Sequence, residues 1–328
     1  QMAERGYCNL NKSVLKQISK SLEDDPGTDL GTVLHKLSST YADMRRMVGA
    51  RRTRKQKGVV ECPFDLPSKV VQAALSGKPI WEGISRAVIQ LSETVVVKVA
   101  QVLDPDEHDV LQYLEERIPS IPAPRALGLV RVGTTLFLFM TLIPGVTLES
   151  RWPSLSKEAK IHVQHSLDEH FLALRQLKLP SGAPFGLPAG RRLCKDVRRD
   201  ERVSTSPIYS EAAFNDFLLS SPSSHAAQGY IDWLRSMLRV DHCIVFTHAD
   251  LHPRNVMVTS GPDGGVELSG IIDWESSGYY PEYWEHLKAM NTRSIKDTSD
   301  WWDYLPPSIL GYDRDLVLDR VIESTVVY

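Results

Sequence analysis

Three polar side chains, Asp250, Asn255 and Asp273, stand in an otherwise apolar stretch of the chain, from Ile244 to Glu275. Asp250 and Asn255 belong to the segment T-H-A-D-L-H-P-R-N, and Asp273 directly follows the apolar run Leu268–Ile272. A carboxylate can accept or orient the proton of a hydroxyl group. An amide oxygen and a second carboxylate supply the few protein oxygens that Mg²⁺ takes beside phosphate and water. These residue types therefore indicate metal-assisted chemistry on a hydroxyl.

A β-hairpin is predicted to position these groups. Val256–Val258 and Val266–Ile272 are rich in β-branched residues, and the sequence S-G-P-D-G-G between them strongly favours a turn. The hairpin would return the chain so that Asn255 and Asp273 lie side by side. The alternative is that the loop residues merely cap turns. A second carboxylate at the returning end of the hairpin makes that alternative weaker.

The spacing H-x-D-L-x-x-x-N places a catalytic carboxylate and a metal-binding amide on one loop in kinase-type phosphotransferases. Phosphoryl transfer concentrates negative charge on phosphate oxygens, so it needs Mg²⁺, cationic clamps and a positioned hydroxyl. We therefore predict Asp250 as the catalytic residue, and Asn255 and Asp273 as metal ligands. His248 is expected to support the loop.

The segments T-H-A-D-L-H-P-R-N-V-M-V and G-I-I-D-W-E, followed by G-Y-Y-P-E-Y-W-E, resemble the aminoglycoside phosphotransferase family. These small-molecule kinases also include choline and homoserine kinases, and the segments are especially similar to family members common in fungi. The resemblance implies an α+β, bilobal, protein-kinase-like fold with a small β-rich N-lobe and a larger, mainly helical C-lobe. It also implies ATP (or GTP) and Mg²⁺ as cofactors, and direct in-line transfer of the γ-phosphoryl group to a hydroxyl of a small molecule.

Lys98 stands inside the valine-rich run V-V-V-K-V. Burying a lysine is costly unless it meets an anion, although an edge-strand lysine can face water instead. The resemblance gives Lys98 the role of binding the α- and β-phosphates, with Glu107 of the following helix as its ion-pair partner. Acidic residues in a first turn also simply favour a helix N-terminus.

The resemblance implies two further contacts to the nucleotide. Gly83 and Ser85 would belong to the turn that covers the phosphates, where a glycine lets backbone amides approach. Backbone groups of Met140 and Leu142, in the segment F-M-T-L-I-P-G, would bind the adenine edge.

Changes in periodicity predict three regions: an N-terminal helical extension with a basic linker (1–79), the N-lobe (80–142) and the C-lobe (143–328). Helices are predicted at 68–77, 105–114, 156–177, 210–219, 225–238 and 280–290, and a loop at 180–205. The basic run at 45–57 is expected to be a solvated linker. Binding of a protein partner through this extension stays open.

Acidic and aromatic residues crowd the C-terminal region, among them Glu275, Glu282, Trp301 and Trp302. Carboxylates beside aromatic faces can hold a cationic amine. Glu275 and Glu282 are therefore predicted substrate-binding residues for an amine-bearing alcohol. The equally weighted alternative is an acidic surface over tryptophans packed as core.

The composition argues against two kinds of partner, nucleic acid and membranes. The formal net charge of −3 gives no reason to expect nucleic acid, and no apolar run reaches the length of a membrane span. The four cysteines are scattered, and no signal-peptide pattern is seen, so a cytoplasmic location is expected.

Two other functions remain open: a catalytically silent kinase-like binding module, suggested by the single glycine near residue 83, and a protein kinase. The chain has no A-P-E element, and Ala249 stands where many protein kinases have an arginine that docks a phosphorylated loop. A protein kinase is therefore the weaker alternative, and activity is expected to need no activating phosphorylation.

Overall fold

The computed structural model describes residues 66–83, 86–100, 106–187, 193–197, 201–220, 224–261 and 265–326. The chain divides into two compact units, one within residues 1–103 and 127–142, the other formed by 104–126 and 143–328. Residues 1–65, which hold most of the predicted helical extension and its basic run, lie outside the described residues, as does Ser85. The helix predicted at 68–77 is present as Leu66–Ser76. The predicted domain boundaries stay a prediction.

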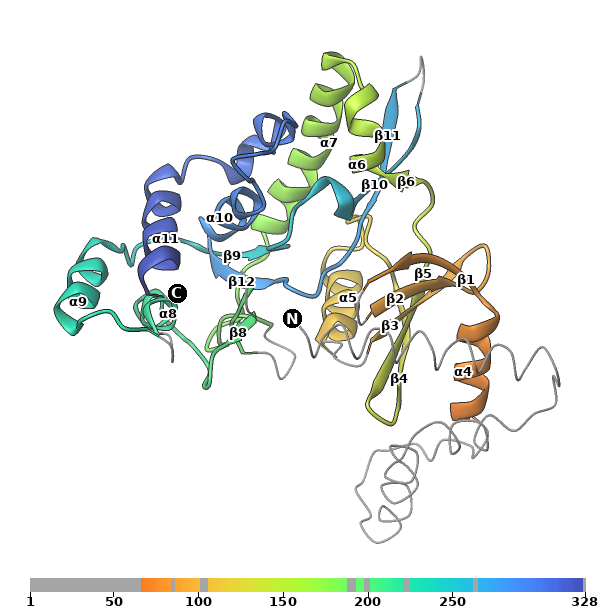
Figure 1. The fold of residues 1–328 in the computed structure, drawn as a ribbon, viewed down its shortest axis with the longest axis horizontal. Helices are drawn as coiled ribbons and strands as arrows, with labels where there is room; N and C mark the ends of the chain where they lie inside the picture. The colour runs from red at the N-terminus through yellow and green to blue at the C-terminus, as the bar shows by residue number, and fades with distance from the viewer. Residues whose placement is uncertain are drawn as a thin grey trace, which may run out of the picture. The chain divides into compact units, whose positions relative to one another are not determined.

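The first unit is built on a five-stranded sheet with the strand order β1-β2-β3-β5-β4. Helix α4 packs on this sheet (Figure 1) through a core that includes Val70 and Ala74 of the helix and Val97 and Phe137 of the sheet. The elements of this unit are α4 (Leu66–Ser76), β1 (Lys78–Glu82), β2 (Arg86–Gln90), β3 (Val95–Ala100), β4 (Ala126–Val132) and β5 (Thr135–Thr141).

Strand β3 owes its place at the centre of this sheet to its run of valines, whose branched side chains suit a pleated surface. It pairs antiparallel with β2 and with β5, and Lys98 lies opposite Val88 and Leu138. Only 6% of the surface of Lys98 is exposed. The alternative of an edge-strand lysine facing water is therefore wrong.

The second unit is mainly helical. Its longest helix, α7, begins after the N-cap Ser156, whose side chain accepts a hydrogen bond from Ala159 N, and runs beside β9 and β11 (Figure 1). Its helices are α5 (Asp106–Arg117), α6 (Leu148–Arg151), α7 (Lys157–Arg175), α8 (Glu211–Leu219), α9 (Gln228–Met237), α10 (Trp284–Asn291) and α11 (Asp313–Thr325), with 3₁₀ turns η2 (Trp152–Ser154), η3 (Pro253–Asn255), η5 (Trp301–Tyr304) and η6 (Pro307–Ile309). Its strands are β6 (Val146–Thr147), β7 (Lys195–Val197), β8 (Glu201–Val203), β9 (Ile244–Thr247), β10 (Val256–Ser260), β11 (Val266–Ile271) and β12 (Gly278–Pro281).

The predicted hairpin is present. Strands β10 and β11 pair antiparallel with Val256 opposite Ile271, and β6 pairs with the other edge of β10. Immediately beyond the paired residues, Ile272 N donates to Asn255 O at 2.8 Å. The residues that flank Asn255 and Asp273 are therefore held together by the backbone.

Two predicted elements need correction. The region predicted as a loop at 180–205 contains the short hairpin β7–β8. The helix predicted at 280–290 begins later, as α10 at Trp284, because Gly278–Pro281 forms β12 and pairs with β9. Aromatic residues such as Tyr279 and Tyr280 suit a strand, and Pro281 stands at its last position.

Within the described residues, no helix combines the length and the apolar character needed to cross a bilayer.

Candidate active site

His248 stabilises the loop that follows β9 through hydrogen bonds made by both of its ring nitrogens. This side chain is fully buried. Its Nε2 lies 3.0 Å from Ile272 O, to which it donates, and its Nδ1 accepts a hydrogen bond from Asp250 N at 3.2 Å. His248 therefore joins the loop to the residue before Asp273, which agrees with the supporting role expected for it.

Asp250 is oriented by two neighbours on the same loop. Asn255 Nδ2 donates to Asp250 Oδ2 at 2.8 Å and to Asp250 O at 2.9 Å, and Arg254 Nη2 lies 3.3 Å from Asp250 Oδ1. With its nitrogen engaged in this way, the amide oxygen of Asn255 is the atom left to bind a metal. Asn255 follows Asp250 by five residues on the same loop, and this spacing lets its amide group hydrogen-bond to the carboxylate of Asp250.

Burial raises the pKa of the Asp250 carboxyl group, and the neighbouring Asp273 adds to this effect, while Arg254 and His248 oppose it. A carboxylate with a raised pKa is a stronger base than an exposed one. Burial also lowers the pKa of His252 to about 4, so this ring is neutral at pH 7 and its Nδ1 can accept from Arg254 N at 3.2 Å.

Glu285, at the start of α10, is the residue that sequence reasoning missed. It is 1% exposed, and its carboxylate accepts hydrogen bonds from His248 N at 2.6 Å and from Ala249 N at 3.1 Å. Ala249 has a φ of 62°, in the left-handed region that costs energy for a residue other than glycine. Glu285 therefore holds the strained backbone that presents Asp250.

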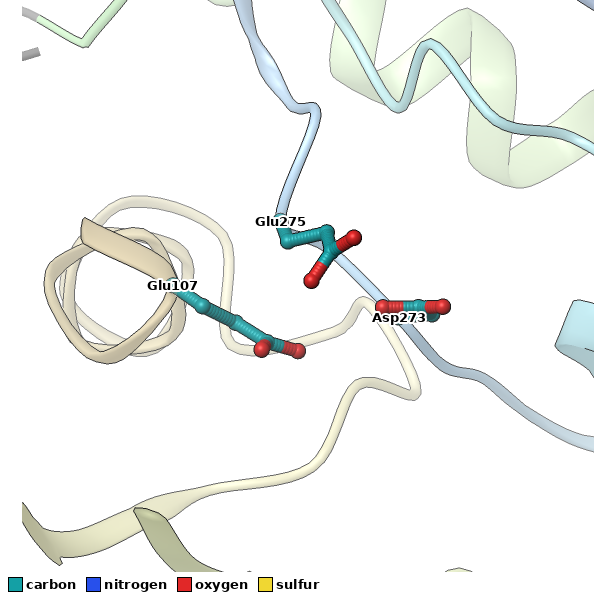
Figure 2. Close-up of side chains that lie close together, drawn as sticks. All are labelled: Glu107, Asp273 and Glu275. Carbon is teal, nitrogen blue, oxygen red and sulfur yellow. The ribbon is translucent and has the colours of Figure 1, made fainter. Parts of the chain in front are cut away.

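Three carboxylates meet beside the end of β11. Ligand atoms of Glu107, from the first turn of α5, and of Asp273 and Glu275 all lie within 4.8 Å of one another. Figure 2 shows the three side chains pointing toward one another, two from the stretch after β11 and one from the helix. Asp273 has a φ of 65°, which turns the chain sharply at this point.

This donor set fits a magnesium ion. Hard carboxylate oxygens are the ligands Mg²⁺ prefers, and gathering three like charges is unfavourable without a cation. Asp273 and the nearby Asn255 would hold the metal, with Glu107 and Glu275 beside it. Glu275 was predicted as a substrate-binding residue; its place in this cluster also makes it a candidate metal ligand, and the substrate role stays a prediction.

A cavity of about 530 Å³ opens on Asp250. Residues of the loop, of β7, of α10 and of α11 line it, including Ala249, Val197, Asn291 and Ser324. Pockets of this size commonly accept small molecules. A hydroxyl-bearing substrate can therefore reach the carboxylate.

The family model described as "Phosphotransferase enzyme family" matches residues 76–301, more than two thirds of the chain. The chain belongs to this family. No curated protein matches it. Among solved structures, the gentamicin complex of APH(2")-IIa is 13% identical, with a TM-score of 0.50 over 81% of this chain and 87% of that one. Aminoglycoside phosphotransferase APH(4)-Ia is 15% identical, with a TM-score of 0.51 over 80% of this chain and 91% of that one.

At these identities the similarity to members of the phosphotransferase family establishes the fold alone. It confirms the predicted α+β, protein-kinase-like fold, with a β-rich N-terminal part and a mainly helical C-terminal part. The likeness to fungal members stays a prediction.

The predicted nucleotide residues of this phosphotransferase lie in the first unit, except Glu107. Gly83 stands directly after β1, and its N–H donates to Arg86 O at 2.8 Å. Met140 is in β5, opposite Val96. Leu142 N donates to Thr94 O at 2.8 Å, so this N–H does not face an adenine ring as predicted, and only the carbonyl of Leu142 is retained. The pairing of Lys98 with Glu107 stays a prediction, since the two residues belong to separate units.

Glu282 does not join the cluster around Asp250. Its Oε2 lies 3.7 Å from Arg175 Nη2, and its Oε1 accepts from Cys243 N at 3.3 Å. These contacts tie the segment before α10 to α7 and to the start of β9, and the substrate role of Glu282 stays a prediction.

Proposed function

We propose that this chain is an ATP-dependent kinase that transfers the γ-phosphoryl group to a hydroxyl of a small molecule by direct in-line transfer. The observation that carries the proposal is the Asp250–Asn255 contact on a loop whose carboxylate faces a cavity. One structure with this fold is described as the streptomycin–ATP–APH(2")-IIa ternary complex, which favours ATP over the GTP that the sequence left open.

Each residue has a defined part in the reaction. Asp250 accepts the proton of the acceptor hydroxyl, and Asn255 and Arg254 keep its carboxylate in place. Asp273 and Asn255, with Glu107 and Glu275 beside them, would bind Mg²⁺, which neutralises charge on the phosphate oxygens. Lys98 binds the α- and β-phosphates, and Gly83 with Ser85 covers them.

The amine-bearing acceptor stays a prediction, although several of the residues that suggested it make other contacts. Trp301 and Trp302 are buried, Asp300 pairs with Lys160 at 2.8 Å, and Glu282 pairs with Arg175. The alternative of tryptophans packed as core accounts for this region. The cytoplasmic location and a protein partner for the N-terminal extension stay predictions.

The test has two stages. Mg²⁺-dependent binding of ATP is measured first, by thermal shift, and ADP release is then followed against a library of alcohols. Asp250→Ala should lower transfer by about 10²-fold or more, because a positioned base contributes 10²–10⁴-fold, and should leave ATP binding intact. A chain that binds Mg²⁺–ATP but transfers to no alcohol would instead be a binding module, and one that phosphorylates only proteins would be a protein kinase.

A further inference from the structure

A second cavity, of about 550 Å³, adjoins the cavity on Asp250. Arg320 and Ser324, one turn apart on α11, belong to the linings of both cavities. Helices α10 and α11 pack against each other and contribute residues to both linings (Figure 1). Arg320 and Ser324 are exposed, so the boundary between the two cavities consists of side chains that solvent reaches.

The second cavity, called the apolar groove below, differs from the first in its lining. Polar side chains predominate around Asp250, whereas five apolar side chains line the groove: Met290, Ile295, Leu316, Val317 and Val321. None of the five is buried, and Ile295 and Val317 are exposed. Single apolar side chains on a surface need no explanation, but several that gather in one hollow mark a binding site.

The apolar residues of α11 continue from the core into the groove. Ile322 and Val326 are buried and pack in a core with Leu234 of α9, and Val321 is half-buried at the edge of that core. Val317 lies one turn before Val321, on the same face of the helix, and is 62% exposed. Packing of α11 in the core therefore does not account for an apolar residue at position 317.

The two cations of the groove are already paired with carboxylates. Arg293 Nη1 lies 3.8 Å from Asp303 Oδ1, and Arg320 Nη1 lies 3.4 Å from Glu323 Oε2. Among the described residues that line the groove there is no carboxylate. The groove therefore offers a ligand mainly apolar contact.

We propose that the acceptor is an amphiphilic alcohol, whose hydroxyl lies at Asp250 and whose neutral apolar tail occupies the groove. This proposal rests on the proposed kinase function. The acceptor itself is the occupant because the groove adjoins the acceptor cavity and has the volume of a small-molecule site. An arginine packs its methylene stem against apolar groups while its guanidinium stays in water, so an alkyl chain can pass along Arg320. The substrate class is thus alcohols with an alkyl or aryl tail.

The test uses alcohols that differ only in their tails. One series is ethanol, butan-1-ol and hexan-1-ol; the other compares hexan-1-ol with 6-aminohexan-1-ol and 6-hydroxyhexanoate. Their Kd for the full chain is measured by NMR titration, with and without Mg²⁺–ADP. Each added methylene group should lower the Kd by about two- to fourfold. A charged end should raise the Kd about tenfold, because the groove cannot solvate it.

Three results would overturn the proposal. The first is a Kd that does not fall with the length of the tail. The second is a charged end, of either sign, that leaves the Kd of the six-carbon alcohol unchanged. The third is the absence of measurable binding by hexan-1-ol.

Variants locate the effect in the groove. Val317→Asp should weaken the binding of hexan-1-ol about tenfold and leave that of ethanol unchanged, whereas Val317→Leu should keep the preference for the longer tail. Val240→Asp is the matched control, because Val240 is also 62% exposed but lines neither cavity. Equal effects of Val317→Asp and Val240→Asp on the Kd of hexan-1-ol would overturn the assignment.

The two proposals fail in different ways. The kinase function fails if the chain does not bind Mg²⁺–ATP, which is measured without any acceptor. The apolar tail fails if nucleotide binding is normal and the affinity for alcohols does not depend on the tail.

Discussion

At the scale of single residues, Asp250 combines two demands that oppose each other. A base must be ionised, yet the surroundings of Asp250 raise its pKa and so disfavour the charge. Arg254 and Asn255 limit this cost by contacting both carboxylate oxygens. A base with a raised pKa works closer to neutral pH. The burial that makes the charge of Asp250 costly therefore also makes its carboxylate a stronger base.

Because ionising the buried Asp250 costs stability, the difference in stability between Asp250→Asn and the wild type should depend on pH. The folded-state pKa of Asp250 is raised, so the folded chain binds its proton more tightly than the unfolded chain, and its contribution to stability falls as pH rises through that pKa. Removing the charge should therefore raise the free energy of unfolding at pH 7 by about 0.5–2 kcal/mol, with the difference vanishing below the ordinary pKa of 3.8.

Thermal melts from pH 3.5 to 8 check this. The control is Asp241→Asn, since Arg239 lowers the pKa of that exposed carboxyl group and the sign is opposite. A variant Asp250→Asn that is less stable than the wild type at pH 7 would contradict the prediction.

Glu285→Gln tests the backbone support of the loop. The substitution keeps the shape but weakens the hydrogen bonds from His248 N and Ala249 N, so Asp250 loses its position. We expect kcat to fall by about 10²-fold while the Kd for Mg²⁺–ATP is unchanged, and the free energy of unfolding to fall by about 1–3 kcal/mol.

Glu211→Gln is the matched control for Glu285→Gln. Glu211 is a second buried carboxylate that accepts a backbone hydrogen bond, from His242 N at 2.9 Å, away from the catalytic loop. Glu211→Gln should lower the free energy of unfolding and leave kcat unchanged. Equal loss of kcat in both variants would show that Glu285 acts only through stability.

The sequence predicts these residues unequally. Asp250 and Asn255 are found because their spacing is fixed by the loop that joins them. Glu285 is missed because nothing in P-E-Y-W-E separates it from Glu282. The difference lies in tertiary burial: Glu285 is 1% exposed and points at the loop, while Glu282 is half-buried against Arg175.

At the scale of elements, Gly145 controls the position of the β10–β11 hairpin. Its φ is +107°, and an added Cβ would lie 2.1 Å from Val258 O in β10. Gly145→Ala should therefore break the β6–β10 pairing and lower the free energy of unfolding by more than about 2 kcal/mol.

Gly182→Ala is the control that shows whether the loss of stability comes from the positive φ or from the close approach to Val258. Gly182 also has a positive φ, +75°, but an added Cβ would meet nothing within 4 Å. Chemical denaturation of both variants measures the difference. If the two lose the same stability, the close approach to Val258 is not what requires a glycine.

Elements were predicted best where local signals were strong. The β10–β11 hairpin has valine-rich runs around a turn, and α7 has an N-cap at Ser156, predicted to within one residue. Strands β7 and β8 were missed because each has only three residues. Strand β12 was not predicted, and its last two residues were assigned to a helix, because its partner, β9, lies far away in sequence.

At the scale of the whole molecule, the proposed chemistry needs both units, since Lys98 belongs to the first and the carboxylates to the second. The fold of each unit follows from sequence pattern, whereas the residues that line the cavity on Asp250 do not. Which of many charged residues face one cavity is decided by packing alone.

The short connection after Asp273 predicts that the activity does not depend on phosphorylation of the chain. Only residues 274–277 separate Asp273 from β12, which leaves no length for an activation segment. Protein treated with a phosphatase should therefore keep its full rate of ADP formation. A rate that falls on this treatment would contradict the expectation.

We propose that Asp273 binds the metal and that Asp250 serves the acceptor, and the same Asp-to-Asn change tests both roles. Asparagine tolerates the φ of 65° at position 273, so the backbone is kept. The measurement is the Kd for ATP with and without Mg²⁺. Asp273→Asn should weaken Mg²⁺-dependent binding about tenfold or more, as loss of a charged ligand does, while Asp250→Asn keeps the wild-type Kd. Wild-type Mg²⁺-dependent affinity in Asp273→Asn would contradict the account.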